Sequence, residues 1–267
     1  MGRVTTTDRR GALRFGAGLT AAALTTGCST TARDPVAAGH SASPAHPASP
    51  AHPARAAPAA PAPRRFPGQP VQIDHGPRDH PRVALTFHGQ GDPAIAYALL
   101  KEAERAHAKV TVLAVGTWLD EHPAVARRIL DGGHDLGNHT LNHRDINTMS
   151  EAEARAEITG CADRLRRLTG SIGTWFRPSR TQRATPLVES LARTAGYPHV
   201  LSYDVDSLDF TSPGAAEVTR KVTSEIREGS VVSLHFGYAD TVAALPALLE
   251  DLDRRGLAAV TTTELLT

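Results

Sequence analysis

The chain has 267 residues, with 29 Lys and Arg side chains against 28 Asp and Glu, and a formal net charge of +1. A nearly neutral chain lacks the concentrated positive charge that nucleic-acid-binding proteins carry, so we expect no nucleic-acid partner. Composition changes sharply along the chain, and the N-terminal third must therefore be considered separately from the rest.

Residues 1–28 have the features of an export signal. A basic start that includes Arg9 and Arg10 precedes a short apolar run over Phe15–Leu24 and small residues before Cys28. The apolar run is shorter than the roughly 20 residues that a membrane-spanning helix needs. Leu24-Thr25-Thr26-Gly27-Cys28 resembles a lipobox, so we predict lipidation of Cys28 and anchoring to the outer face of the cytoplasmic membrane. Cys161 would then have no disulfide partner, and we expect it to pack on a helix.

Residues 29–66 are rich in Ala and Pro and contain two copies of Ala-Ser-Pro-Ala-His-Pro. Such a segment has almost no large apolar side chain to bury, so we expect a disordered spacer. Fully extended at ~3.1 Å per residue, it would span on the order of 100 Å. The remaining residues, 67–267, have the size of one domain.

Apolar, β-branched runs alternate with helical patterns through this domain, which indicates repeated βα units and parallel strands. We expect strands at Val83–Phe87, Val110–Val115, His134–Gly137, Gly173–Phe176, His199–Asp204, Val231–His235 and Ala259–Thr263. We expect helices at Pro93–Ala106, Pro123–Asp131, Ser150–Thr169, Thr185–Ala195, Ala215–Glu228 and Thr241–Arg255. About seven such units predict an α/β fold of the (β/α)7 type, a closed or nearly closed barrel, with an open doubly wound sheet as the alternative.

Polar residues follow the carboxyl ends of the expected strands, the edge at which chemistry takes place in both folds. They are His88, His139, His143, Arg177, the segment Asp204–Asp209, and His235. His139 and His143 are four residues apart, so on a helical turn both imidazoles would lie on one face and could bind one metal ion.

Five segments, "VALTF", "GHDLGNHTLNH", "WFRPS", "LSYDVDSLDF" and "SVVSLHFG", resemble in order and spacing the motifs of the NodB-like polysaccharide deacetylases, carbohydrate esterase family 4. The resemblance covers roughly residues 80 to 265. It implies a distorted (β/α) barrel that uses a divalent metal, commonly zinc, to remove acetyl groups from amino-sugar polymers such as peptidoglycan or chitin.

The resemblance also implies roles for single residues. His139 and His143 match the two histidine ligands of the metal, whose third ligand in the family is an aspartate. His235 matches the acid that protonates the departing amine, and Asp209 matches the aspartate that orients this histidine. Arg177 matches the arginine that pairs with the catalytic base. We expect a monomer.

The first motif departs from the family, which has Thr-Phe-Asp-Asp-Gly-Pro. Here "TFHGQGDP" puts His88 at the position of the base and Gly89 at that of the metal ligand, while Asp92 falls later. His88 could be a replacement base or a third metal ligand, Asp92 could swing in as a ligand, or the domain could have lost hydrolysis and kept glycan binding. We expect His88 to do the work, because Asp92 before Pro93 is typical of a helix cap.

Two further departures lie in later motifs. Ser179 and Arg180 replace the usual proline and tyrosine of the third motif, and Phe210 replaces the tryptophan that follows the fourth-motif aspartate.

Overall fold

Strand β2 (Arg82–Gly89) is the centre of the sheet in the computed structural model, which describes residues 60–267. It pairs in parallel with β3 (Val110–Ala114) on one side and with β7 (Val231–His235) on the other. All of its residues after Arg82 are buried, as expected of a strand covered on both faces. The expected signal, Cys28 and most of the expected spacer lie outside the described residues.

The sheet continues from β3 to β4 (Asp135–Asn138) and from β7 to the short β6 (Val205–Asp206), while β8 (Ala258–Ala259) pairs with the start of β2. A separate pair joins β1 (Gln72–Ile73) to β5 (Val200–Leu201). Phe176 links the two sheets, because it bridges Asn138 on one side and Val200 on the other. The result is the expected α/β architecture of parallel strands, a barrel with one irregular side.

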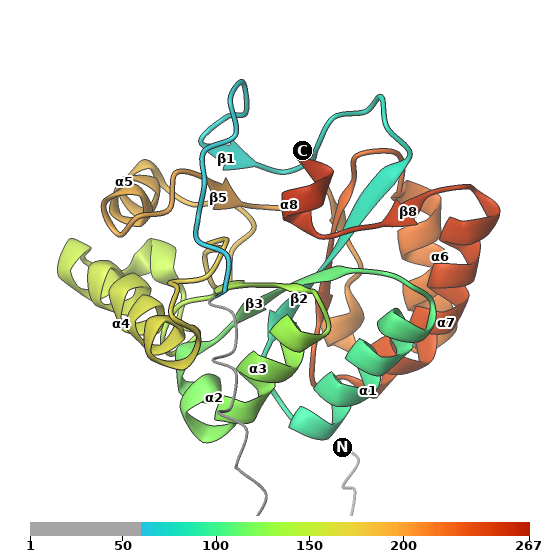
Figure 1. The fold of residues 1–267 in the computed structure, drawn as a ribbon, viewed down its shortest axis with the longest axis horizontal. Helices are drawn as coiled ribbons and strands as arrows, with labels where there is room; N and C mark the ends of the chain where they lie inside the picture. The colour runs from blue at the N-terminus through green and yellow to red at the C-terminus, as the bar shows by residue number, and fades with distance from the viewer. Residues whose placement is uncertain (1–59) are drawn as a thin grey trace, which may run out of the picture. The chain divides into compact units, whose positions relative to one another are not determined.

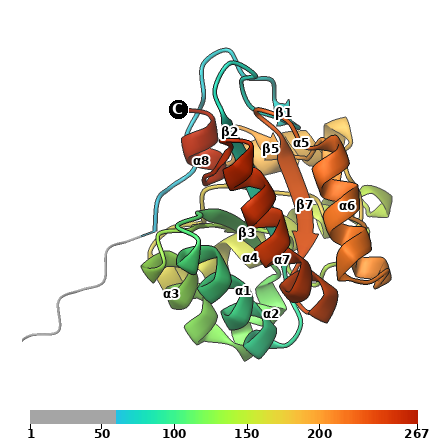
Figure 2. The ribbon, with the colours of Figure 1, turned by 90° about the vertical axis from the view of Figure 1, so that its right-hand side faces the viewer.

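Helices surround the strands (Figures 1 and 2). The longer ones are α1 (Pro93–Arg105), α3 (Pro123–Asp131), α4 (Glu151–Thr169), α5 (Pro186–Thr194), α6 (Ala215–Glu225) and α7 (Ala239–Arg254). The shorter ones are α2 (Gly116–Glu121), α8 (Thr262–Leu265) and the 3₁₀ turns η1 (Ile146–Thr148) and η2 (Asp209–Thr211). Each of the six longer helices lies within about three residues of its expected range. In the described part of the chain, no helix combines the length and apolar character needed to cross a membrane.

Helix α4 shows how local sequence sets the ends of an element. Ser150 and Glu153 form the reciprocal capping box at its start, and Gly170 ends it in a left-handed conformation with φ of 79°. Cys161 is buried on this helix, and its thiol donates to the carbonyl oxygen of Ala114 on β3 at 3.4 Å. The packing role expected for Cys161 is therefore confirmed.

Three expected strands are wrong in extent. Of the segment His199–Asp204, only Val200 and Leu201 form a strand, β5. In the segment Gly173–Phe176 only Phe176 makes bridges, since Gly173 has a φ of 85° and lies so close to β4 that a Cβ there would come within 2.8 Å of a backbone oxygen. The strand expected at Ala259–Thr263 ends at Ala259, because Thr261 caps α8 together with Glu264. Helix α2 was not expected from the sequence.

Residues 60–66, which we expected in the spacer, pack against the domain. The ring of Phe66 stacks on Trp175 with ring centroids 5.3 Å apart, and its backbone N–H donates to Nε2 of His199 at 3.0 Å. The backbone N–H of Ala60 donates to the carbonyl of Thr169, at the end of α4. These contacts give the folded part of the chain an N-terminal strap that begins before the boundary expected at residue 67.

Candidate active site

Three histidines converge at the carboxyl end of the sheet. His88 comes from β2, and His139 and His143 come from the loop after β4; each offers a ring nitrogen, and these three atoms lie within 4.8 Å of one another. The loop is not the helical turn that we expected, because Thr140 and His143 have φ values of 68° and 54°. Left-handed backbone at residues other than glycine carries strain, and such strain concentrates at functional sites.

The position of His88 follows from the alternation of side chains along β2. Thr86 and His88 face the barrel interior, where the Thr86 hydroxyl donates to the carbonyl of Val232. His88 lies beside His235 of β7 in the strand register, and their rings stack with centroids 4.3 Å apart. The strand therefore places His88 between the two histidines of the loop and the histidine of the fifth motif.

The hydrogen bonds define which nitrogens carry protons. Nδ1 of His139 lies 3.1 Å from the carbonyl oxygen of Arg177, which can only accept, so this nitrogen donates and Nε2 keeps its lone pair. That lone pair faces Nδ1 of His88 at 2.7 Å, so His88 donates from Nδ1 in this arrangement. Its Nε2 then accepts, from the Ser233 hydroxyl at 3.0 Å and from the Arg177 guanidinium at 3.4 Å.

Burial keeps all three imidazoles neutral. It lowers the pKa of His88 and of His139 well below the usual value, and it lowers the pKa of His143 to about 4. Neutral imidazole is the form that binds metal ions, and three such groups leave a coordination position open on a divalent ion such as Zn²⁺. The chemistry of this donor set therefore fits a divalent metal.

Arg177 is fully buried beneath the histidines. Its Nε donates to the carbonyl of Leu201 at 3.3 Å and one terminal nitrogen donates to that of Ser202 at 2.9 Å, while the other faces His88. Burial lowers the pKa of Arg177 to about 10, so the guanidinium stays charged at neutral pH. The partner that the resemblance predicts for this arginine, a base, corresponds in the structure to His88.

Asp209 and His235 form a hydrogen-bonded pair. Oδ1 of Asp209 lies 2.6 Å from Nδ1 of His235, and Oδ2 accepts from the His235 backbone N–H at 2.8 Å and from the Thr241 hydroxyl at 2.7 Å. The carboxylate is fully buried, whereas the imidazole reaches the cavity. This geometry holds the proton on Nδ1 and turns Nε2 of His235 toward the space beside the three histidines.

A cavity of about 470 Å³ opens over these groups. Its walls combine three aromatic rings with polar side chains, and the lining residues are His88, Gln90, His143, Arg180, Thr181, Gln182, Tyr203, Asp206, Phe210, His235 and Tyr238. Phe210 keeps 45% of its surface exposed and meets the His235 ring edge-on, with centroids 5.3 Å apart. Exposed rings at the edge of a polar cavity are suited to stacking against sugar rings.

The Gly-rich turn after β2 does not bring Asp92 to the histidines. The Asp92 carboxylate accepts from the backbone N–H of Ala94 at 2.8 Å and caps α1, with Pro93 at the first helical position. Gly91 has a φ of 98°, and a Cβ there would meet Gly237 at 2.8 Å. The expected capping role of Asp92 is confirmed. The turn that carries Asp92 packs closely against Gly237 in this conformation.

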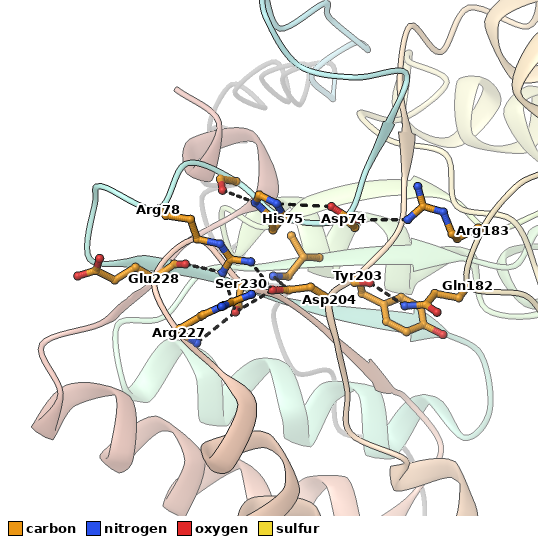
Figure 3. A network of polar contacts seen from close by, with 12 residues as sticks. Asp74, His75, Arg78, Gln182, Arg183, Tyr203, Asp204, Arg227, Glu228 and Ser230 are labelled. Carbon is orange, nitrogen blue, oxygen red and sulfur yellow. Dashed lines mark hydrogen bonds and ion pairs between the residues drawn. The ribbon is translucent and has the colours of Figure 1, made fainter.

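Asp204 does not lie with the active-site groups, in contrast to the expected cluster Asp204–Asp209. It lies near the start of β7, where Oδ1 accepts from the backbone N–H of Val231 at 2.8 Å and Oδ2 pairs with Arg78 at 2.7 Å and accepts from Ser230 (Figure 3). The chain continues from Asp204 through β6 before it reaches Asp209, so the two carboxylates serve opposite ends of the sheet.

Sequence reasoning missed two groups that support the site. Ser233, which donates to His88, lies two residues before His235 on β7 and so on the same face, which is a signal that the strand period could have provided. Thr241, which donates to Asp209, lies at the start of α7, and no motif marks it.

Comparisons with known proteins agree with this geometry. A polysaccharide deacetylase family model matches residues 75–200. A peptidoglycan-N-acetylglucosamine deacetylase from Bacillus cereus is 29% identical over 194 residues, which is 71% of this chain and 90% of that protein. A chitooligosaccharide deacetylase from a Bradyrhizobium species is 28% identical over 197 residues, 65% of this chain and 85% of that protein.

Among solved structures, a carbohydrate esterase family 4 pseudoenzyme from Bacillus anthracis has a TM-score of 0.70 at 24% identity, covering 74% of this chain and 70% of that one. A mutant of the same pseudoenzyme with restored enzymatic activity has the same TM-score. At this identity the likeness shows the fold. The family model, the deacetylase relatives and the five motifs together support a NodB-like polysaccharide deacetylase of carbohydrate esterase family 4, with a divergent first motif.

Proposed function

We propose that the chain is a metal-dependent hydrolase that removes N-acetyl groups from an amino-sugar polymer such as peptidoglycan. One observation carries the proposal: three neutral imidazoles converge beside the Asp209–His235 pair at the floor of a single cavity. The deacetylase relatives, which are named for peptidoglycan and chitooligosaccharides, support this substrate class.

In this proposal His88 replaces the missing aspartate as the third metal ligand. Its Nδ1 lies 2.7 Å from Nε2 of His139, so the two nitrogens are close enough to bind one ion. Binding through Nδ1 requires the proton to sit on Nε2, where the hydroxyl of Ser233 at 3.0 Å can accept it. Zinc, the metal most often held by histidine ligands at open sites, is our proposed ion, and it would polarise the acetyl carbonyl.

The remaining chemistry falls to the other groups of the cavity. His235 presents Nε2 to the substrate and donates a proton to the departing amine, while Asp209 stabilises the imidazolium form. The attacking water must lose a proton, and two groups that line the cavity have an oxygen or nitrogen that can accept one, Asp206 and His235 itself. Arg177, buried and charged, lies 3.4 Å from Nε2 of His88 and supplies a fixed positive charge beneath the reacting centre.

The test measures metal content and acetate release with the purified full chain. We expect about one divalent ion per chain, and acetate from peptidoglycan or N-acetylglucosamine oligomers that stops after chelation and returns with zinc. His139→Ala should lose both the ion and the activity. His80→Ala, which changes an exposed histidine, is the matched control and should keep both. Unchanged metal content in the His139→Ala protein contradicts the proposal.

A second candidate is a surface protein that binds glycan without hydrolysing it. The replacement of both first-motif aspartates favours it, and the neighbour from Bacillus anthracis shows that this fold also occurs in a pseudoenzyme. Glycan binding by a metal-loaded chain that releases no acetate would identify this function.

We also propose that the protein is exported and held by a lipid on Cys28 at the outer face of the cytoplasmic membrane. The basic start, the short apolar run and the lipobox-like sequence support this location. The Ala- and Pro-rich segment that follows would give the domain reach into the cell wall.

A further inference from the structure

Arg180 occupies an unusual position in the wall of the cavity. It lies next to Ser179 in a turn and has a φ of 58°, a left-handed conformation that a side chain of this size rarely adopts. Such strain persists only where the surroundings hold it in place, and it is frequent at ligand-binding positions.

Hydrogen bonds fix the turn on both sides of Arg180. The buried hydroxyl of Ser179 donates to the carbonyl of Arg144 and accepts from Thr140 at 2.9 Å. After Arg180, the Gln182 amide donates to the carbonyl of Tyr203 at 2.9 Å (Figure 3). The backbone conformation of the turn is therefore fixed, and so is the direction in which the Arg180 side chain leaves the backbone.

The side chain of Arg180, in contrast, has no partner within residues 60–267. Neighbouring arginines do: Arg144 lies 4.0 Å from Glu153, and Arg183 pairs with Asp74 at 3.0 Å (Figure 3). Arg180 instead lines the cavity beside His143, whose pKa is lowered first by burial and next by the Arg180 charge. An unpaired cation is thus aimed into the space where substrate would lie.

Arg180 and the proposed metal ion would both be positive in one cavity, whose lining in the described residues offers a single carboxylate, Asp206. An anion that lies between them would remove this repulsion and gain a charge-assisted hydrogen bond from the guanidinium. In the bound substrate the acetyl group and the sugar hydroxyls are neutral and do not supply that charge. The chemistry of the cavity therefore favours a substrate that is itself acidic.

We propose that Arg180 is a specificity-determining residue that binds a carboxylate carried by the amino-sugar substrate next to the reacting acetamido group. The inference rests on the proposed function for its choice of a glycan ligand. Binding, unlike hydrolysis, can be measured whether or not the chain turns substrate over, so the two proposals fail separately.

The probe is the disaccharide of N-acetylglucosamine and N-acetylmuramic acid, which bears a free carboxylate, compared with the methyl ester of the same disaccharide. Titration calorimetry on the full chain should show the acid bound about tenfold more tightly than the ester, a factor that corresponds to about 1.4 kcal/mol. Raising the salt concentration to about 1 M should reduce this ratio, because the interaction is partly exposed to solvent.

Variants assign the preference to one side chain. Arg180→Gln should bring the acid-to-ester ratio close to one while leaving ester binding unchanged, and Arg180→Lys should keep part of the ratio. Arg183→Gln removes the same charge three residues away, from a side chain paired with Asp74, and should keep the full ratio.

Two results overturn the proposal: equal binding of acid and ester by the unmodified chain, or a tenfold preference that survives in Arg180→Gln. If the preference depends on Arg180 but no glycan yields acetate, the proposed hydrolysis is wrong and the assignment of Arg180 stands. If acetate is released but acid and ester bind equally, the hydrolysis stands and the role of Arg180 is wrong.

Discussion

Replacing His88 separates the accounts of the first motif most directly. His88→Ala removes one of three converging imidazoles and leaves His139 and His143 as the remaining nitrogen ligands. Loss of a group that only supports a ligand costs roughly 10- to 100-fold in metal affinity, so loss of a ligand should cost at least about 100-fold. We expect the His88→Ala protein to be folded, poor in metal and inactive.

Asp92→Ala should do the reverse. The Asp92 carboxylate makes one exposed capping bond, to the backbone N–H of Ala94, and removing such a cap costs about 0.5–2 kcal/mol. For a domain of this size, each kcal/mol lowers the melting temperature by roughly 2–4 °C. The Asp92→Ala protein should therefore melt a few degrees lower and keep its metal and activity.

The assay compares both variants with the unmodified chain in three measurements: zinc content after dialysis, acetate release, and thermal unfolding with chelator present. Chelation matters because bound metal would itself raise the melting temperature and confuse the two effects. Our reasoning is refuted if Asp92→Ala loses the metal while His88→Ala keeps both metal and activity, because the turn would then rearrange to bring Asp92 into the site.

Two further predictions concern other parts of the chain. Cys28→Ala should move the protein from the membrane fraction to the medium; equal membrane retention of both forms would exclude the lipid anchor. Burial lowers the pKa of His134 to about 4 in the folded chain, so between about pH 6.5 and 4 the unfolded chain binds this proton and the folded chain does not. The free energy of unfolding should therefore fall by up to about 3 kcal/mol as the pH drops over this range. In urea unfolding with chelator, His134→Asn should lose less stability over this range than the unmodified chain, and an equal loss in both would contradict the assignment.

Much of the fold follows from patterns that the sequence shows openly. The runs Val83–Phe87 and Val231–His235 are apolar and β-branched, and both are central strands, because such runs have few alternatives to burial. The strand predicted at Ala259–Thr263 was wrong because two local signals compete there. Its threonines favour strands, yet Thr261 and Glu264 have the spacing of a capping box, and this local signal prevails.

The sequence predicted which residues form the site better than it predicted how they are arranged. The sequence identified His88, His139 and His143, but the two loop histidines converge through left-handed residues and not through a helical turn. Such a conformation has no sequence signature at Thr140, which rarely adopts it. Distances between elements are likewise set by packing, so the contact between Ser233 and His88 appears only once β2 and β7 are side by side.

The strap formed by residues 60–66 has a mechanical consequence. Ala60 joins the domain at the end of α4 and lines the same surface hollow as Asp135, the first residue of β4. His139 follows the last residue of β4, at the opposite end of that strand. A pull on the chain before residue 60 would therefore load the hydrogen bond from Ala60 to Thr169 first, and the stacked rings of Phe66 and Trp175 only after it. If the chain is anchored as proposed, force on the anchored segment would act at one end of the barrel, and the histidines at the other end would keep their spacing.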